Sequence, residues 1–552
     1  MTEIILAVDL GTGGPKVALV RLDGEVLAHE LTPIETTFLP GGGAVQNVDD
    51  WWQAIADSTR RLMDLKVADP KDIVGINCTG QWGSSIPIGE ENKAIGPCIL
   101  WMDARGHQYS QEILGGVGPI EIEGYGINKA FKFIQKSGGA PALAGNDPLG
   151  HYLYLKNEEP ELFKQTRKIL EPVDYLSLKF SGEVKASPAS MILSWLVDIR
   201  DLKNPKYAPD LISLLNRDPS KLPDLVPIGS KVGLILDSVA DDLGIPRSIP
   251  VVTGLPDLLS ACTGSGGLED FEMHMAISTT SWLSCHVPFK KTDPFRQIAT
   301  VPGVMKGKYM LANNHDTAGI CLQWLKDSLY KPISKLSSEV SGPNGKVRGK
   351  SDNMTRDQDE IGYQDLDLIA KNSKPGSGGV IFTPWLQGER CPVDDRTLRG
   401  SFLNISLNTT REDMTRALFE GVALNARWMM DAVEHFIKRK TGPIRFIGGG
   451  AVSDVWCQIH ADVMNREVRQ VSKPLLANVR GAALFAGISL GKISSSDVAK
   501  DVKIGKTFVP TDENLKVYDE LYGEFKKVYK AQKNMYKRLN RHGGPFDDKE
   551  SQ

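Results

Sequence analysis

Residues 4–20 read IILAVDLGTGGPKVALV, and this stretch decides the fold of the N-terminal half. An apolar run over residues 4–8 ends at Asp9, and a glycine-rich turn then leads through Lys16 into a second apolar run over residues 17–20. Two β-type runs joined by a tight turn predict a hairpin, not a strand followed by a helix. P-loops and dinucleotide-binding loops need a helix behind their glycines, so this turn belongs to neither class.

The turn has the composition of an anion-binding loop. Glycine lets backbone N–H groups approach a phosphate closely, while Thr12 supplies a hydroxyl group and Lys16 a positive charge. Asp9 would repel a phosphate directly, so its carboxylate suits a bridging cation such as Mg²⁺. An ordinary hairpin with a glycine turn is the alternative interpretation of the same residues.

Three later segments also place polar or small residues after a strand. Residues 251–265 read VVTGLPDLLSACTGS, where Asp257 opens a helix; a carboxylate there is often only a helix-dipole cap. Residues 276–283, AISTTSWL, predict a strand with consecutive hydroxyl side chains, which is either a second phosphate-contacting turn or simply a polar strand end. Residues 446–452, FIGGGAV, predict a strand, a glycine turn and then a helix. Each signal is weak when taken singly.

Composition excludes several classes of protein. A chain of 552 residues is too long for one core and predicts two to four domains. A formal net charge of -3 gives no indication of nucleic-acid or membrane-surface binding, and no apolar run is long enough to span a bilayer. The polar N-terminus does not resemble a signal peptide. Seven dispersed cysteines favour reduced thiols in the cytoplasm over disulfides or a zinc site.

Strand-like and helical segments alternate along the chain, which predicts an α/β fold. The predicted strands are 75–78, 168–170, 251–253, 276–283 and 445–448, and the predicted helices are 48–65, 411–438 and 455–464. Residues 333–376 are polar and rich in turn formers, so we expect an excursion on the second domain there. Residues 513–540 carry aromatic and aliphatic side chains at helical spacing and predict a packed C-terminal helix.

Together these segments resemble one family. DLGTGGPK at 9–16, GLPD at 254–257, the hydroxyl-rich strand and GGGA at 448–451 occur in the order seen in the FGGY carbohydrate kinases, most closely in the xylulokinase-like (pentulose kinase) branch. Further segments are similar to elements of that family: TGQWG at 79–83, ILWMDAR at 99–105, EPVDYL at 171–176, GERCPVDDRTLRG at 388–400, and residues 417–425. The resemblance spans roughly residues 4–487.

The resemblance implies an α/β fold of two ribonuclease-H-like domains, of the actin/hexokinase/heat-shock ATPase superfamily, with an interdomain cleft. We expect residues 1–256 to form an N-terminal domain that binds sugar and phosphate. Residues 257–495 would form a C-terminal domain with the catalytic aspartate and the nucleotide site, and residues 496–552 a helical extension. The expected partners are small molecules, a sugar and ATP, with no nucleic acid or membrane; a homodimer is a further expectation.

The resemblance also implies roles for individual residues. Asp257 would be the general base, and Asp9 a second catalytic residue beside Mg²⁺, the metal that accompanies ATP. ATP contacts are expected from Gly11, Thr12, Gly13, Lys16, Thr280, Ser281, Gly319, Gln323, Gly449, Gly450, Ala451 and Asp454. A buried structural glutamine is an equally good interpretation of Gln323. Sugar contacts are expected from Gln81, Trp82, Trp101, Asp103 and Asp257.

The reaction implied is ATP-dependent phosphorylation of a ketopentose such as xylulose, giving a sugar 5-phosphate and ADP. Residues 80–84 read GQWGS where xylulokinases usually read GQMHG, Leu258 stands where many relatives carry Asn or Gln, and Thr279 replaces a glycine. These departures lie in the expected pocket, so ribulose, glycerol and erythritol remain alternatives. A non-catalytic binding protein is another, although Asp9 and Asp257 are both present.

Overall fold

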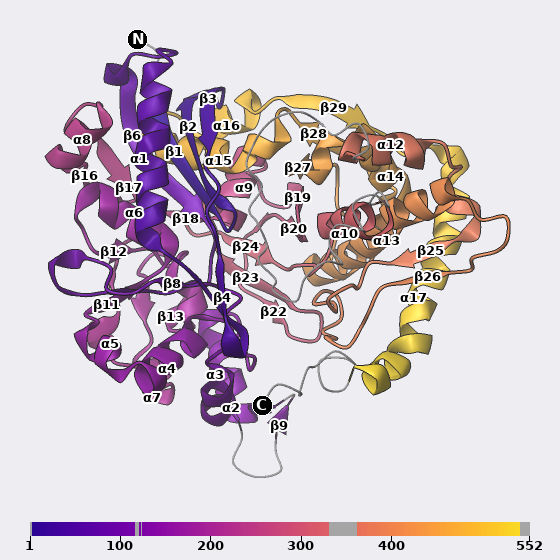
Figure 1. Cartoon of the computed structure of the whole chain (residues 1–552), viewed down its shortest axis with the longest axis horizontal. Helices are drawn as coiled ribbons and strands as arrows, with labels where there is room; N and C mark the ends of the chain where they lie inside the picture. Colours follow the sequence, from indigo (N-terminus) through magenta and orange to yellow (C-terminus); the bar gives the residue numbers. More distant parts are fainter. Residues whose placement is uncertain (1–2, 116–120, 123, 331–360, 541–552) are drawn as a thin grey trace, which may run out of the picture.

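The structure is a computed structural model that describes residues 3–115, 121–122, 124–330 and 361–540. The centre of its N-terminal half is a mixed seven-stranded sheet. Its strand order is β16 (Lys231–Leu234), β17 (Pro250–Val252), β6 (Ile73–Gly80), β1 (Ile4–Gly11), β2 (Gly14–Arg21) and β3 (Val26–Leu31), with β18 (Leu255–Pro256) also paired to β6. Strand β1 runs antiparallel to β2 and parallel to β6 (Figure 1). The glycine-rich turn is therefore the tip of a hairpin, as the sequence predicts.

Both faces of this sheet are buried. Ile4, Leu6 and Val8 pack in one hydrophobic cluster, while Ile5 and Ala7 pack in the other, because side chains alternate along a strand. Helices α1 (Val48–Asp64) and α6 (Pro172–Ser181) cover the first face. Helices α9 (Asp257–Ser265) and α15 (Ala477–Ser489) cover the second.

A five-stranded sheet forms the C-terminal half. Its order is β20 (Ser281–Ser284), β19 (Met273–Ile277), β27 (Ile444–Ile447), β28 (Val468–Val471) and β29 (Ile504–Phe508). Strand β19 is antiparallel to β20 and parallel to β27, which repeats the arrangement of β1, β2 and β6. The two-domain α/β class is thus confirmed. The single strand predicted over residues 276–283 is wrong, because these residues form the tip and part of both arms of a hairpin.

Helices α9 and α15 lie between the two sheets with their backbones in contact. A Cβ atom on Gly264 would lie 1.8 Å from the carbonyl oxygen of Ala477, and one on Gly481 would lie 1.8 Å from that of Ser260. Glycine at both positions is therefore required for this close approach. Helix α15 also joins the two halves, because buried Arg480 donates to the Gly24 carbonyl at 3.1 Å and to the Ser472 carbonyl at 2.8 Å.

The remaining elements surround these two sheets. The lower part of the N-terminal half contains α2 (His107–Leu114), α3 (Ile127–Ser137), α4 (Pro148–Glu158), α5 (Pro160–Gln165), β11 (Lys168–Leu170) and α7 (Pro209–Leu214), whereas α8 (Asp237–Leu243) lies at the upper left of Figure 1. The C-terminal half adds a four-stranded sheet of β21 (His286–Val287), β24 (Tyr309–Ala312), β23 (Ile298–Pro302) and β22 (Thr292–Asp293). It also contains α10 (Gly319–Leu329), α12 (Tyr363–Lys371), α13 (Arg411–Ile437), α14 (Asp454–Met464), α16 (Ser495–Asp501) and α17 (Asp512–Leu539).

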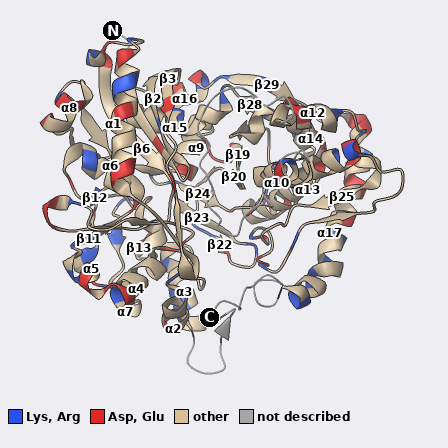
Figure 2. Cartoon of the chain, viewed as in Figure 1, with Lys and Arg blue, Asp and Glu red and all other residues tan. Residues whose placement is uncertain are grey.

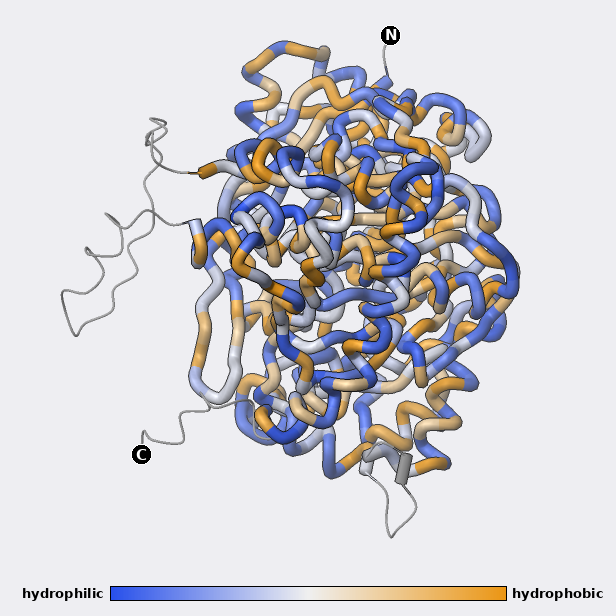
Figure 3. The backbone as a smooth tube through the Cα atoms, turned by 90° about the vertical axis from the view of Figure 1, so that its right-hand side faces the viewer, coloured by the Kyte–Doolittle hydropathy of each residue, from blue (hydrophilic) through white to orange (hydrophobic). Residues whose placement is uncertain are grey.

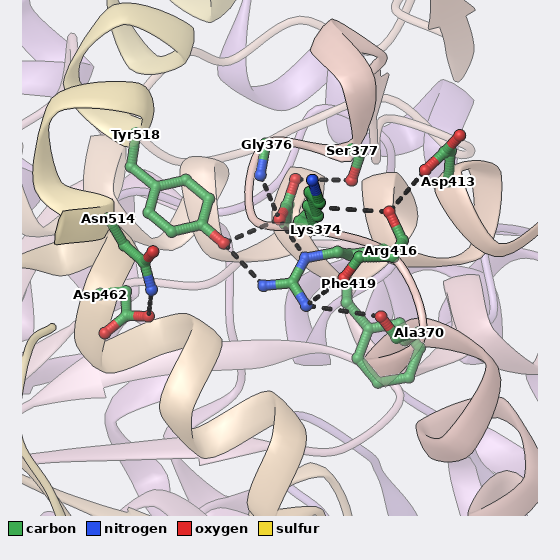
Figure 4. Close-up of polar contacts among 12 residues, drawn as sticks. Ala370, Lys374, Gly376, Ser377, Asp413, Arg416, Phe419, Asp462, Asn514 and Tyr518 are labelled. Carbon is green, nitrogen blue, oxygen red and sulfur yellow. Dashed lines mark hydrogen bonds and ion pairs between the residues drawn. The ribbon is translucent and has the colours of Figure 1, made fainter. Parts of the chain in front are cut away.

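The predicted C-terminal helix is confirmed as α17, and it packs on α13 and α14. Figure 4 shows Tyr518 of α17 directed at Arg416 of α13, whose guanidinium donates to the Tyr518 hydroxyl at 3.0 Å. Glu420 accepts from that hydroxyl at 2.7 Å and pairs with Arg416 at 2.7 Å. Asn514 donates to Asp462 of α14 at 2.8 Å, so buried polar contacts anchor the helix at two places.

The polar excursion predicted over residues 333–376 is partly testable. Residues 333–360 lie outside the described residues, and residues 363–371 form helix α12, which the sequence analysis did not predict. Leu366 and Ala370 are buried where α12 meets α13, and this packing stabilises a helix that the polar composition had obscured.

The surface of the molecule is mixed in character. Acidic and basic residues are interspersed along the outer helices (Figure 2), and hydrophilic and hydrophobic residues alternate along the tube (Figure 3), as expected of elements that bury one face. Among the described residues, no helix combines the length and hydrophobicity that a bilayer crossing needs.

Candidate active site

The carboxyl ends of β1, β6 and β18 bring three predicted segments together. These strands are parallel neighbours, and their register places Leu10 opposite Gly80 and Gly80 opposite Pro256. The Gln81 N–H donates to the Leu10 carbonyl at 2.8 Å. The hairpin tip, the turn that begins at Gln81 and the first residue of α9, Asp257, therefore meet at one edge of the sheet.

Asp257 is partly buried at this edge, and its carboxylate accepts a hydrogen bond from the Leu258 N–H at 2.7 Å. Burial raises the pKa of Asp257 to about 7; the Leu258 N–H opposes this shift and the negative charge of Asp9 adds to it. A carboxylate with a pKa near neutrality is suited to accept a proton at physiological pH. This is more than a helix-dipole cap requires.

Asp9 lies opposite Lys16 across the hairpin. Burial raises the pKa of Asp9, while the Lys16 charge and a hydrogen bond from the Asn478 side chain act in the opposite direction. Within the described residues, no three carboxylate, histidine or cysteine side chains gather to hold a metal ion. A single carboxylate that faces Asp257 nonetheless fits Mg²⁺, which keeps several waters and takes its other ligands from substrate phosphates.

The hairpin tip presents open backbone on one side. Gly14 has φ +131°, and a Cβ atom there would lie 2.1 Å from the Thr32 carbonyl oxygen, so this position is closely packed. Gly13 is exposed, and a Cβ atom there would meet nothing within 4 Å, so open space lies beside the tip of the hairpin. Lys16 Nζ donates to the Leu475 carbonyl at 3.1 Å, which links the hairpin to the C-terminal half.

Two turns of the C-terminal sheet also lie next to each other, because they follow adjacent parallel strands. Strands β19 and β27 are parallel with Ala276 opposite Ile447, so the turns at residues 278–280 and 448–450 leave the sheet at one edge. A Cβ atom on Gly319, the first residue of α10, would lie 2.3 Å from the Ser278 carbonyl oxygen. Gly319 therefore allows α10 to rest directly on the hydroxyl-bearing turn.

The predicted nucleotide residues of this half differ in accessibility. Gly449, Gln323 and Asp454 are exposed, Thr280 and Gly450 are partly buried, and Ala451 is fully buried. The exposure of Gln323 removes the interpretation of that residue as a buried glutamine. Asp454 pairs with Lys506 and accepts from Gln470, whose amide also donates to the Ala451 carbonyl at 2.7 Å. The nucleotide roles of these residues stay predictions.

Ser281 is placed differently from its expected position. Its side chain is fully buried, and its hydroxyl group pairs with His315 Nδ1 at 3.0 Å. As the first residue of β20 it points into the core, because side chains alternate across a strand. In this structure Thr280 and the turn backbone, not the Ser281 hydroxyl, are available to a phosphate.

The predicted sugar side of the site is built on Thr12 and Trp101. Trp101 is 38% exposed, and its indole N–H donates to the Thr12 hydroxyl at 3.2 Å; that hydroxyl in turn lies 3.5 Å from the Gln81 carboxamide oxygen. An exposed indole face beside hydrogen-bonding groups is typical of a carbohydrate subsite. Thr12 therefore contacts the sugar-side residues as well as belonging to the phosphate hairpin.

Two supporting residues escaped the sequence analysis. Gln46 is buried, donates to the Thr12 carbonyl at 2.7 Å and accepts from the Trp51 indole at 3.0 Å. Asn478, at the start of α15, hydrogen-bonds Asp9. Each is a single polar residue far from the motifs, so no local pattern in the sequence singles it out.

Asp103 is 1% exposed and its carboxylate is already engaged. It accepts from the Ala44 N–H at 2.9 Å and pairs with Arg105 at 2.7 Å, and Arg105 also donates to Tyr154 at 2.7 Å. In this structure Asp103 organises the loop beside Trp101, and its role as a direct sugar ligand stays a prediction.

Trp82 and Gly83 occupy the position where the sequence departs from xylulokinases. The Trp82 indole N–H donates to the Ser190 carbonyl at 2.9 Å, and its ring is partly buried against the core. Gly83 has φ +81°, and a Cβ atom there would lie 3.2 Å from Leu193 Cδ1. Glycine at 83 is thus required by the backbone conformation of the turn.

We expect Gly83→His to destabilise the protein by about 1–3 kcal/mol, because a side chain is strained at this positive φ. The free energy of unfolding from urea titration measures the effect. Gly442→His is the matched control: Gly442 is exposed, its added Cβ would meet nothing within 4 Å, and we expect a change of no more than about 0.5 kcal/mol. Equal stability of the two variants would contradict the assignment of strain to position 83.

Comparison with known proteins agrees with this arrangement. The chain is 25% identical over 538 residues to the xylulose kinase of Staphylococcus xylosus, and the aligned region covers 95% of this chain and 99% of that protein. It is 26% identical over 548 residues to the gluconokinase of Bacillus licheniformis, which covers 98% of each. The crystal structure of gluconate kinase from Lactobacillus acidophilus matches with a TM-score of 0.81 at 21% identity, covering 98% of this chain and 100% of that one, which shows a shared fold.

Family models match both halves of the chain. Residues 4–264 match the N-terminal domain of the FGGY family of carbohydrate kinases, and residues 278–490 match its C-terminal domain. The resemblance stated from the sequence is thereby confirmed, while the domain boundaries and the individual site residues stay predictions. This chain belongs to the FGGY family of carbohydrate kinases.

Proposed function

We propose that this kinase transfers the γ-phosphoryl group of ATP to a hydroxyl group of a ketopentose such as xylulose, with Asp257 as the general base. The observation that carries the proposal is the position of Asp257. Burial raises the pKa of this residue to about 7, and the negative charge of Asp9 adds to the shift. Asp257 lies at the edge where the phosphate hairpin and the Gln81 turn meet. Similarity to xylulose kinases over nearly the full chain supports the choice of substrate.

The residues of the site divide the work of phosphoryl transfer. Trp101 and Gln81 would hold the sugar so that one hydroxyl group faces Asp257, which accepts its proton as the oxygen–phosphorus bond forms and the bond to ADP breaks. Lys16 and the open Gly13 backbone would face the phosphates. When bound, Mg²⁺ held near Asp9 would neutralise charge on the phosphate oxygens.

We also infer a cytoplasmic location for this metabolic kinase. All seven cysteines are free and buried, which supports a reducing compartment. Homodimer formation stays a prediction.

Gluconate is a second candidate substrate because gluconokinases share the same fold and a similar level of identity. A coupled assay should compare D-xylulose, D-ribulose, D-gluconate, glycerol and erythritol by kcat/KM with saturating Mg-ATP. We expect a ketopentose to rank first. A clear preference for D-gluconate would overturn the ketopentose and leave the kinase intact. No turnover with any of them, in protein that still binds ATP, would favour a non-catalytic binding role.

We expect Trp101→Ala to raise KM for the preferred sugar by roughly 10–200-fold, the range for a change of pocket shape, while KM for ATP changes little. The indole of Trp101 is exposed beside Thr12, whose hydroxyl accepts a hydrogen bond from its N–H. Initial rates with each substrate varied in turn measure both constants. Trp101→Phe keeps an aromatic face but loses the N–H donor, so it separates stacking from the Thr12 hydrogen bond. A rise in KM for ATP alone would show that the indole faces the nucleotide.

A further inference from the structure

A buried pair of acidic residues lies behind the turn that begins at Gln81, and the proposed mechanism does not use it. Glu171 precedes α6 and Asp174 lies in the first turn of that helix. Glu171 is 3% exposed and Asp174 1% exposed. Carboxylates this deeply buried are costly, so their contacts indicate what they do.

Glu171 holds the backbone of the sugar-side turn. Its Oε2 atom accepts two consecutive backbone hydrogen bonds, from the Gly83 N–H at 3.0 Å and from the Ser84 N–H at 3.2 Å. Its Oε1 atom is buried and has no hydrogen-bond partner among the described residues. The carboxyl group is therefore directed at the turn.

The same turn determines where Trp101 stands. The Ser84 hydroxyl accepts a hydrogen bond from the Trp101 backbone N–H at 3.0 Å. A displacement of Ser84 is thereby transmitted to the residue whose indole forms the exposed face of the sugar subsite. Glu171 thus acts on Trp101 through one intervening residue.

Asp174 supports the other end of the turn. Its carboxyl group accepts from the Ser190 hydroxyl at 3.0 Å, and the Ser190 carbonyl accepts from the Trp82 indole at 2.9 Å. The backbone of residues 83–84 and the side chain of Trp82 are therefore both fixed by one acidic pair.

The charge state of the pair is consistent with a supporting role. Burial raises the pKa of both carboxyl groups well above the usual range, and the proximity of Asp174 raises that of Glu171 further. The Gly83 and Ser84 N–H groups oppose the shift at Glu171. Each negative charge thus disfavours ionisation of the other carboxyl group, because two buried negative charges repel each other.

We propose that Glu171 is a positioning residue for the sugar: it fixes the turn at residues 82–84, and through that turn it sets the place of Trp82 and Trp101 in the subsite. The inference rests on the proposed function, because it assigns the sugar to this side of the site. It goes further in naming a residue that touches no substrate yet controls which sugar fits.

The test compares Glu171→Ala and Glu171→Gln with the wild type. The alanine variant removes both acceptor bonds, whereas the glutamine variant keeps one acceptor oxygen of nearly the same shape. We expect the alanine variant to raise KM for the preferred sugar by at least about tenfold and to change the ranking of D-xylulose and D-gluconate. KM for ATP should stay close to the wild-type value, and the glutamine variant should recover most of the sugar affinity.

Glu420→Gln is the matched control. Glu420 is also a buried glutamate that accepts a backbone N–H, from Gly376 at 3.0 Å, and a hydroxyl group, from Ser377 at 2.7 Å. Its partners Gly376 and Ser377 are labelled in Figure 4 and belong to the C-terminal half. We expect its substitution to lower Tm without a selective change in KM for the sugar.

The outcomes separate this inference from the proposed function. Calorimetric titration of D-xylulose and D-gluconate without nucleotide measures sugar binding independently of turnover. If the wild type binds sugar but shows no kinase activity, and Glu171→Ala binds sugar more weakly than the wild type, the inference is upheld and the proposed function is overturned. An unchanged sugar KM in an active variant would overturn the inference alone. A parallel rise of KM for the sugar and KM for ATP, as in a general loss of stability, would also overturn the inference. If the alanine variant does not fold, Glu171→Gln provides the same test.

Discussion

Asp257→Asn is expected to lower kcat by roughly 10²–10⁴-fold, the contribution of a well-placed general base, while ATP binding and the fold are retained. Asparagine has nearly the shape of aspartate but cannot accept the hydroxyl proton. Its side-chain oxygen can still accept from the Leu258 N–H, so the start of α9 should be preserved. Steady-state rates together with thermal unfolding decide the matter. Near-normal turnover in a folded variant would remove Asp257 from the catalytic role.

The raised pKa of Asp257 predicts how activity and stability depend on pH. The base acts as a carboxylate, so kcat/KM of the wild type should rise with pH through about 7. The folded protein holds this proton more tightly than the unfolded chain, whose aspartate has a pKa of 3.8. The contribution of Asp257 to stability is therefore fully present below that value and is lost as pH rises through about 7.

Asparagine does not titrate in this range. The Tm of Asp257→Asn relative to wild type should consequently be higher at about pH 8 than at about pH 5, whatever its absolute value. Thermal unfolding at the two pH values measures this difference. An identical difference at both would show that Asp257 titrates with an ordinary pKa.

Asp9→Ala is expected to lower kcat by roughly 10²–10³-fold, the loss typical of one preorganised electrostatic contact, and to raise the Mg²⁺ concentration needed for half-maximal rate. Asp9 lies at the end of β1, beside Lys16 and facing Asp257, where a metal-bridged phosphate would lie. Sugar affinity should change little, because the contacts of Trp101 and Gln81 do not involve this carboxylate.

The matched control for Asp9 is Asp23→Ala. Asp23 lies in the turn between β2 and β3, is exposed enough to pair with Arg21 in solvent, and is remote from the tip of the hairpin. Rates measured across a Mg²⁺ titration should therefore be unaffected in this control. If Asp9→Ala weakens sugar binding and leaves the Mg²⁺ titration unchanged, Asp9 faces the sugar and not the metal-bound phosphates.

The sequence predicted the parts of the site that depend on local pattern. Glycines between two apolar runs indicated the hairpin, and the Gly-Leu-Pro-Asp segment indicated a carboxylate at the start of a helix; both are found. These features are set by neighbours in the chain, so they can be read from it.

The parts that depend on tertiary packing could not be predicted in this way. Ser281 was expected to face a phosphate, but the phase of a strand decides which side chains point inward, and the strand ends were not known. Gln46 and Asn478 reach the site only because sheets and helices pack against each other. Asp103 pairs with a residue two positions away, Arg105, and this spacing could have indicated the ion pair.

The backbone contact between α9 and α15 has a consequence for how the enzyme divides its tasks. No methyl group can be added at Gly264 or Gly481, so the spacing of these helices is at its lower limit and cannot be tuned by side-chain size. Asp257 begins one helix, and Asn478, which hydrogen-bonds Asp9, lies in the first turn of the other. The separation of the helix starts that carry Asp257 and Asn478 is thus set by main-chain contact. The turn at residues 82–84 lies outside this rigid unit, so the choice of sugar can be altered there while the chemistry stays constant.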